Sequence, residues 1–215
     1  MLQKRLNWAK KQHNWTVVNW REVIFSEECK FNLFGSNEIS YVRRRKGERY
    51  SDECIKRTVR QVGSRMVWGC YTYHGVGQLV LLDQTMNGVM YQRILEEYLI
   101  SLVEQHFSLL GNVIFQDDSA PCQRAKLVKD YLSKVVISAM QWPGYSRDLN
   151  PMENLWHIMK VEVTKRKPRT LPELDRIIEE VWYEGITAQT LHNLIDSMPD
   201  RINMVIKNKG GSRKY

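Results

Sequence analysis

The segment Val113-Ile114-Phe115-Gln116-Asp117-Asp118-Ser119-Ala120-Pro121 joins a short apolar run to two adjacent carboxylates. The apolar run is typical of a buried strand, and Pro121 suits the start of the helix predicted after it. Ligands of open α/β sheets bind outside the carboxyl ends of strands, which is where Asp118 falls. Because side chains alternate along a strand, Asp117 and Asp118 should face opposite ways, and we expect only one to serve a site. A solvated turn that carries both carboxylates is the alternative.

Strand and helix patterns surround this segment. Apolar runs predict strands at 23–25, 66–71, 78–82 and 113–116 and a β-type stretch at 135–140, and helical spacing predicts helices at 88–107, 125–132, from 151 onward, 171–184 and 187–197. Gly75-Val76-Gly77 predicts a hairpin turn. Residues 33–62 are polar and poorly periodic, which indicates a long excursion with a hairpin near 39–42. This order predicts an α/β fold with a mixed sheet and helices on its faces, an arrangement that several folds share.

Length and composition bound the class of protein. With 215 residues, 43% hydrophobic and 26% charged, the chain is expected to form one globular domain. No apolar run approaches the ~20 residues of a membrane span, and the first residues lack the apolar core of a signal peptide. Cys29, Cys54, Cys70 and Cys122 contain no CxxC pair, so we expect reduced thiols. Core packing is expected for Trp68, Trp142, Trp156 and Trp182, and a turn for Asp83.

Basic residues outnumber acidic ones by 32 to 24, a net charge of +8. They cluster in Arg43-Arg44-Arg45-Lys46, in Lys165-Arg166-Lys167-Pro168-Arg169 and in the tail from Lys207 to Lys214. Such clusters predict a polyanion partner, with nucleic acid the leading candidate. A basic solvated surface is the simpler alternative.

Further acidic residues are candidates for the same site as Asp118. Glu27 and Glu28 are expected just past the first strand, and Glu153 in the first turn of a late helix. Asn150 and Pro151 suit the N-cap and first helical positions, so a capping box also explains Glu153. Three converging carboxylates would suit Mg²⁺, a hard cation that prefers oxygen ligands. Two such ions about 4 Å apart can activate water and stabilise the leaving oxygen in phosphodiester cleavage.

Three motifs resemble the catalytic motifs of Tc/mariner superfamily transposases. The first is Phe25-Ser26-Glu27-Glu28-Cys29-Lys30-Phe31-Asn32-Leu33-Phe34-Gly35, continued by 41–45, 47–50 and 66–69; the second is Gln116 to Cys122; the third is Trp142-Pro143, Ser146 and Asp148 to Trp156. Thirty-four residues separate Asp118 from Glu153, the interval of the Tc-type branch. Met198-Pro199 and Lys209-Gly210-Gly211 resemble the family's ending.

The resemblance implies a ribonuclease H-like mixed five-stranded sheet flanked by helices, with a clamp-loop insertion at 33–62 after the first strand and extra C-terminal helices. It divides the chain into a lead-in at 1–20, a catalytic core at 21–165, and C-terminal helices with a basic tail at 166–215. The implied activity is cut-and-paste transposition, with two Mg²⁺ or Mn²⁺ ions held by Glu27, Asp118 and Glu153. The implied setting is the nucleus, as a homodimer on double-stranded DNA, with transposon ends and target as substrates.

DNA contacts are expected from the clamp loop and from two other basic surfaces, through electrostatic binding of phosphates. The residues are Arg43, Arg44, Arg45, Lys46, Arg49, Arg124, Lys126, Lys165, Arg166 and Lys167. The run from Lys165 to Arg169 also resembles a nuclear import signal.

The sequence departs from the family's pattern at the first catalytic position, where Glu27 replaces Asp. One extra methylene moves a carboxylate by ~1.5 Å, more than the ~0.5 Å that catalytic geometry tolerates. Asp117, Ser119 and Gln123 also stand where relatives have Gln, Asn and His, and the paired helix-turn-helix region of full-length relatives is expected to be missing. We therefore expect a truncated or decayed copy with weakened activity. Two alternatives stay open: an inactive transposase-derived DNA-binding or dimerisation module, and a structure-selective nuclease on the same fold.

Overall fold

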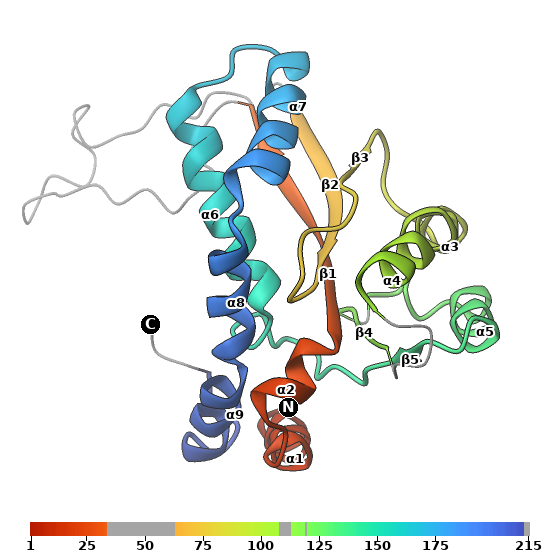
Figure 1. The fold of residues 1–215 in the computed structure, drawn as a ribbon, viewed down its shortest axis with the longest axis vertical. Helices are drawn as coiled ribbons and strands as arrows, with labels where there is room; N and C mark the ends of the chain where they lie inside the picture. Colours follow the sequence, from red (N-terminus) through yellow and green to blue (C-terminus); the bar gives the residue numbers. More distant parts are fainter. Residues whose placement is uncertain (34–62, 108–112, 119, 213–215) are drawn as a thin grey trace, which may run out of the picture.

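The computed structural model describes residues 1–33, 63–107, 113–118 and 120–212, and places a sheet between two layers of helices (Figure 1). In chain order its elements are α1 (Leu2–Gln12), α2 (Val17–Arg21), β1 (Val23–Asn32), β2 (Ser64–Tyr71), β3 (Val80–Leu82), α3 (Gly88–Ile94), η2 (Leu95–Leu99), α4 (Ile100–His106), β4 (Ile114–Gln116), α5 (Lys126–Lys134), β5 (Ser138–Ala139), α6 (Pro151–Arg166), α7 (Leu171–Glu180), η3 (Val181–Gly185), α8 (Ala188–Asp196) and α9 (Met198–Lys207). Both η elements are single π-helical turns. Apart from Leu33, the expected clamp-loop insertion at 33–62 lies outside the described residues, as does Cys54.

The five strands form one mixed sheet in the order β3-β2-β1-β4-β5. β2 runs antiparallel to β1 and β3, whereas β4 runs parallel to β1 and β5 parallel to β4. Parallel neighbours need crossover connections, and helices α3 to α4 and α5 lie in the segments that lead to β4 and β5. The expected mixed five-stranded sheet flanked by helices is confirmed.

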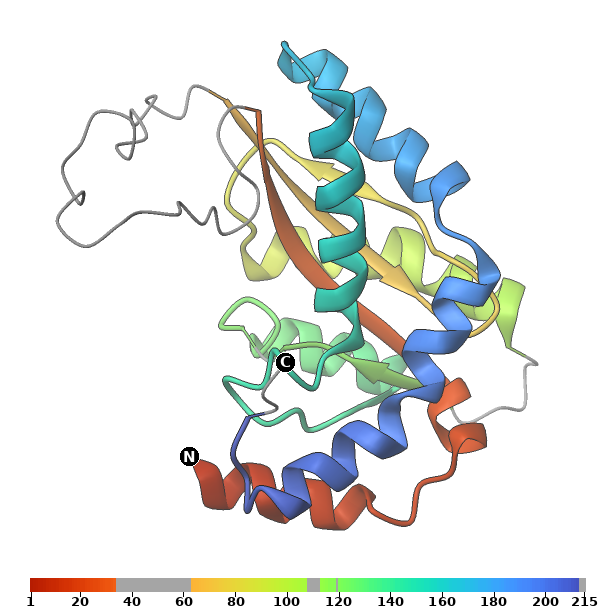
Figure 2. The same ribbon diagram turned by 90° about the vertical axis from the view of Figure 1, so that its left-hand side faces the viewer.

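Side chains that alternate along β1 separate two hydrophobic cores. Val23, Phe25 and Phe31 pack with the core beneath α6, whereas Ile24 packs with the core beneath α3, α4 and α5. Helices α6, α7 and α8 cover one face of the sheet, and α3, α4 and α5 cover the other (Figures 1 and 2). β1 is the central strand, with β2 on one side and β4 on the other. Because helices cover both faces of the sheet, its side chains are buried on both faces.

The lead-in residues form helices. α1 packs against α9, and α2 contacts α8 and α9, so the first and last helices lie together at one end of the molecule (Figure 2). The division of the chain at residues 20 and 165 stays a prediction. No helix within the described ranges is long and apolar enough to cross a membrane.

Two expected boundaries are wrong for physical reasons, and one helix was missed. β1 does not end at Phe25 but continues to Asn32, because it pairs with β2 along eight consecutive residues, and Glu27 and Glu28 therefore lie inside the strand. The stretch 135–140 forms only the short β5, because Val135 caps α5 and Val136 has a φ of 59°. Helix α9, which follows Ser197, was not predicted.

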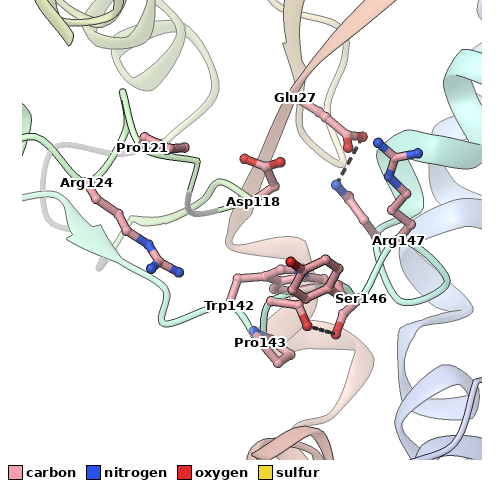
Figure 3. A pocket seen from close by; sticks show the side chains of 11 residues that line it. Glu27, Asp118, Pro121, Arg124, Trp142, Pro143, Ser146 and Arg147 are labelled. Carbon is pink, nitrogen blue, oxygen red and sulfur yellow. Dashed lines mark hydrogen bonds between the residues drawn. The ribbon is translucent and has the colours of Figure 1, made fainter. Parts of the chain in front are cut away.

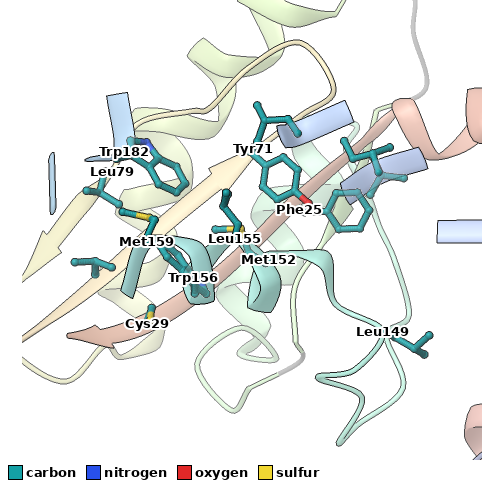
Figure 4. Packing of buried hydrophobic residues seen from close by; sticks show 14 of the residues in the cluster. Phe25, Cys29, Tyr71, Leu79, Leu149, Met152, Leu155, Trp156, Met159 and Trp182 are labelled. Atoms are coloured by element: carbon teal, nitrogen blue, oxygen red, sulfur yellow. The ribbon is translucent and has the colours of Figure 1, made fainter. Parts of the chain in front are cut away.

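A stacked pair of indoles in the first core requires a glycine in β2. Trp156 and Trp182 stack with ring centroids 5.4 Å apart (Figure 4). A Cβ on Gly69 would come within 2.9 Å of the Trp182 ring and 3.0 Å of the Trp156 ring. The expected core positions of all four tryptophans are confirmed, since Trp68, Trp142, Trp156 and Trp182 are at most 6% exposed.

Gly69→Ala is expected to lower the free energy of unfolding by about 1–3 kcal/mol, because the added methyl overpacks the indole pair. Gly144→Ala is the matched control, since nothing lies within 4 Å of a Cβ built there. Urea denaturation followed by tryptophan fluorescence measures both variants. Equal stability of the two variants would contradict the packing account.

Candidate active site

Pairing between β1 and β4 brings two acidic residues together. Phe25 lies opposite Gln116 in this parallel pair, so two residues further on Glu27 and Asp118 occupy neighbouring positions on the α6 face. Both line one cavity of about 580 Å³ (Figure 3). Asp117 is buried at 8% exposure, and of the two adjacent aspartates it is Asp118 that lines the cavity.

α6 supplies a third carboxylate from its first turn. The Asn150 side chain caps this helix by accepting from the Met152 N–H at 3.0 Å. The Asn150 N–H donates to the carbonyl oxygens of Ser146 and Arg147 at 3.3 and 3.0 Å, so it is already bonded to the loop. The Glu153 carboxylate instead contacts Glu27 and pairs with Arg147 Nε at 3.2 Å. The capping-box explanation of Glu153 is therefore wrong.

The Glu27 carboxyl is buried among other acidic groups. Glu27 is only 6% exposed. Asn150 Nδ2 donates to Glu27 Oε2 at 3.2 Å (Figure 3). Burial raises the pKa of Glu27 to about 10, together with the charge of Glu153, a hydrogen bond to it, and the charges of Asp118 and Glu28. A carboxyl with this pKa carries a proton at neutral pH unless a cation replaces that proton.

Glu28 lies on the opposite face and helps to position the loop that carries Asp118. Gln123 Nε2 donates to Glu28 Oε1 at 3.3 Å, while Gln123 Oε1 accepts from the Ala120 N–H at 2.9 Å. Burial raises the pKa of Glu28 to about 7, with the charges of Asp118 and Asp117 adding to the shift and the Gln123 hydrogen bond opposing it. Sequence reasoning noted Glu28 but missed this contact. Alternation along β1 predicts that the Glu28 side chain points away from the cavity.

A buried arginine holds the loop that precedes α6. The Arg5 guanidinium donates to both carboxylate oxygens of Asp148 at 2.7 and 2.8 Å, to Ser146 Oγ at 2.7 Å and to the Gly210 carbonyl oxygen at 2.9 Å. It thereby joins α1, the loop and the segment after α9. Sequence reasoning missed this contact, because nothing in the local pattern distinguishes Arg5 from its basic neighbours.

The three carboxylates are gathered without being arranged as ligands of one ion. Within the described ranges, no group of three or more His, Cys, Asp or Glu side chains is placed to hold a metal ion. Asp118 Oδ1 accepts from the Ala120 N–H at 3.1 Å, and Glu153 is paired with Arg147.

The expected DNA-binding residues have different surroundings. Arg124 lines the cavity, and Lys126 is exposed at the start of α5. Lys165 pairs with Glu162, and Arg166 pairs with Glu162 and Glu180, whereas Lys167 is exposed and forms the C-cap of α6. The remaining predicted positions, Arg43, Arg44, Arg45, Lys46 and Arg49, lie outside the described residues. All ten stay predictions.

Comparison with known proteins identifies the class to which this fold and site belong. Residues 22–175 match the sequence family described as DDE superfamily endonuclease. The transposable element Tc1 transposase of Caenorhabditis elegans is 34% identical over 212 residues, which cover 98% of this chain and 77% of the relative. The transposable element Tcb2 transposase of Caenorhabditis briggsae is 32% identical over 213 residues, with the same two coverages, 98% and 77%. The chain therefore belongs to the DDE superfamily of endonucleases, among the Tc/mariner transposases.

Solved structures confirm the ribonuclease H-like fold. The catalytic domain of Mos1 mariner transposase aligns with a TM-score of 0.78 at 17% identity, covering 99% of this chain and 95% of that one. The Mos1 mariner paired end complex with Mn aligns with a TM-score of 0.82 at 19% identity and 99% coverage of this chain. The chain spans 63% of the length of the Mos1 chain in that complex.

The buried Glu27 carboxyl should make stability depend on pH. Its folded-state pKa of about 10 exceeds the ~4.3 of glutamate in an unfolded chain. Between these values the folded state binds more protons, so the unfolding free energy falls as pH rises. Without divalent metal, Glu27→Gln should make the unfolding free energy fall less steeply between about pH 5 and about pH 9. Near pH 9 the variant should therefore have a higher Tm than the unaltered chain, by about 2–4 °C for each kcal/mol of stability gained.

Thermal unfolding in a chelating buffer measures this pH dependence. Glu104→Gln removes a carboxyl from an exposed position and should leave the wild-type slope unchanged. The pKa assignment fails if Glu27→Gln keeps that slope too.

Arg5→Ala should lower the free energy of unfolding by about 3–5 kcal/mol, because it removes the guanidinium that donates to both oxygens of the buried Asp148 carboxylate. The side chains of this pair are 4% and 10% exposed. Arg176→Ala breaks a surface pair with Glu180, in which Arg176 is 62% exposed, and should cost less than about 0.5 kcal/mol. Chemical denaturation compares the two, and similar losses would refute the central role of Arg5.

Proposed function

We propose that this chain is the catalytic domain of a cut-and-paste transposase, which cleaves DNA phosphodiester bonds with divalent metal ions and transfers the freed strand to target DNA. The observation that carries the proposal is that Glu27, Asp118 and Glu153 come from β1, the end of β4 and α6 to one site. Membership of the DDE superfamily and the Tc1 and Tcb2 transposase relatives support the same function.

The donor set fits Mg²⁺ or Mn²⁺. Both ions bind carboxylate oxygens, and Glu27, Asp118 and Glu153 offer these oxygens at a site where burial and like charge already favour a proton on Glu27. Bound at these residues, two ions would activate a water and stabilise the leaving oxygen. Solved Mos1 paired end complexes with Mn and with Mg support this choice of metals.

The protein's own groups would bind and orient the substrate. Arg124 and Arg147 line the cavity and present guanidinium groups to phosphate oxygens. Arg147 would exchange its contact with Glu153 for the phosphate, since its side chain is 87% exposed. Asn150 holds Glu27 on the α6 side of the cavity by donating to Oε2.

The proposal extends to partners and location. Double-stranded DNA carrying transposon ends, and a DNA target, suit the net charge of +8. A homodimer on DNA and a nuclear location belong to the same proposal. Mos1 itself has been solved as a paired-end complex with the left transposon end and as a strand transfer complex.

One observation favours a second function, an inactive DNA-binding or dimerisation module. The Glu27 carboxyl is hydrogen-bonded to Glu153, and within the described ranges the carboxylates are not arranged as ligands of one ion. We therefore propose that metal placement is impaired and activity weak.

A Mn²⁺-dependent nicking assay on DNA with family-type ends tests both functions. The unaltered chain should nick weakly, and Glu27→Asp should raise the rate by about 10- to 100-fold, since a 1 Å misplacement can cost about 100-fold. Asp118→Asn in the Glu27→Asp background should lower the nicking rate by more than about 100-fold. Loss of a residue that only supports a metal ligand typically costs about 10- to 100-fold. Glu104→Asp is the matched control and should change nothing.

The remaining outcomes separate the alternatives. Robust nicking by the unaltered chain would overturn the impairment, and DNA binding without nicking by either the unaltered chain or the Glu27→Asp variant would favour the inactive module. Preferential cleavage in a panel that includes RNA–DNA hybrids would identify a structure-selective nuclease instead.

A further inference from the structure

A second groove, of about 680 Å³, adjoins the active-site cavity. One wall is a face of α1, formed at helical spacing by Lys4, Asn7, Trp8, Lys11 and Gln12. The other wall is Arg124 with residues 141–145. Because Arg124 and residues 142–145 line both hollows, the groove is continuous with the cavity that holds Glu27 and Asp118. Figure 3 shows Arg124 across the cavity from Glu27.

The charged residues along this groove are all basic. Lys4, Lys11 and Arg124 are exposed, and its described lining contains no Asp or Glu. Within the described part of the chain none of the three forms a salt bridge, in contrast to Lys165 and Arg166 on α6. Free cations beside an acidic cavity suit an anionic chain whose reacting phosphate enters that cavity.

An exposed aromatic ring stands where the groove meets the cavity. Tyr145 lines both hollows and is 86% exposed. Its backbone has a φ of 56° and is anchored, because Arg5 donates to the Tyr145 carbonyl oxygen at 3.3 Å and to Ser146 Oγ at 2.7 Å. A solvent-exposed ring on a fixed backbone, next to cations, is the combination that stacks unpaired bases in single-strand binding proteins.

We propose that this groove binds a single strand of DNA where it leaves the active-site cavity, with its phosphates on Lys4, Lys11 and Arg124 and an unpaired base on Tyr145. The proposal rests on the proposed function, in which DNA is the substrate. Lys4 and Lys11 are about 10 Å apart along the helix axis, the rise of about three nucleotides on one strand. A single strand is the favoured occupant because a base within a duplex has no free face for Tyr145.

The phosphate contacts are tested by fluorescence anisotropy with a labelled single-stranded oligonucleotide of about 12 nucleotides, in chelating buffer so that no cleavage occurs. Lys4→Gln/Lys11→Gln should weaken binding and reduce the slope of log K against log salt by about 1.4, since each phosphate contact contributes about 0.7. Lys10→Gln/Lys129→Gln removes the same charge from exposed positions outside the groove lining and should keep the wild-type slope. Equal effects of the two double variants would overturn the proposal.

The stacking contact has its own test. Tyr145→Leu should weaken binding about tenfold, Tyr145→Phe should stay close to wild type, and an oligonucleotide with abasic sites should bind equally to all three. The stacking role would be overturned if Tyr145→Leu bound the abasic strand more weakly than the unaltered chain does. It would also be overturned if Tyr145→Leu weakened binding of a blunt duplex but left binding of the single strand unchanged. If the chain binds DNA and neither set of groove variants matters, the groove proposal alone fails. If the unaltered chain binds no DNA at all, the proposed function fails with it.

Discussion

Carboxylates that repel one another lie side by side in this protein because β1 and β4 pair in parallel. The register that sets Phe25 opposite Gln116 makes neighbours of Glu27 and Asp118. The same pairing requires helices on both faces of the sheet, since strands at this position are buried on both sides. One of those helices, α6, begins beside the cavity and adds Glu153. The acidic site is thus a consequence of the register in which β1 and β4 pair.

A proton on Glu27 relieves this repulsion at neutral pH, and neighbouring polar contacts hold the acidic groups in place. Asn150 bonds to Glu27 from one side of β1, and Gln123 bonds to Glu28 from the other. Arg5 fixes the loop before α6 through Asp148, and Arg201 donates to the carbonyl oxygen of the same residue at 3.4 Å. Polar side chains around the site therefore do the positioning, while the two apolar cores supply the stability.

Local pattern was enough to predict the strand that precedes Asp118, the helix that carries Glu153, and that only one of Asp117 and Asp118 lines the cavity. What it missed depends on distant partners. β1 is ten residues long because β2 pairs with it, and Arg5 finds Asp148 from 143 residues away. The capping box at Glu153 was chemically reasonable, but the Asn150 N–H is bonded to loop carbonyls whose positions no local pattern reveals.

The consecutive acids in β1 have a consequence for how the strand is aligned. If β1 slid by one residue, Glu28 would replace Glu27 and a carboxylate would still enter the cavity, so the acidic pair by itself does not select the alignment. The aromatic residues do, because the same shift would turn Phe25 and Phe31 out of their core and bring Lys30 towards it. Burial of Phe31, four residues from Glu27, thereby fixes which of the two adjacent glutamates faces the cavity.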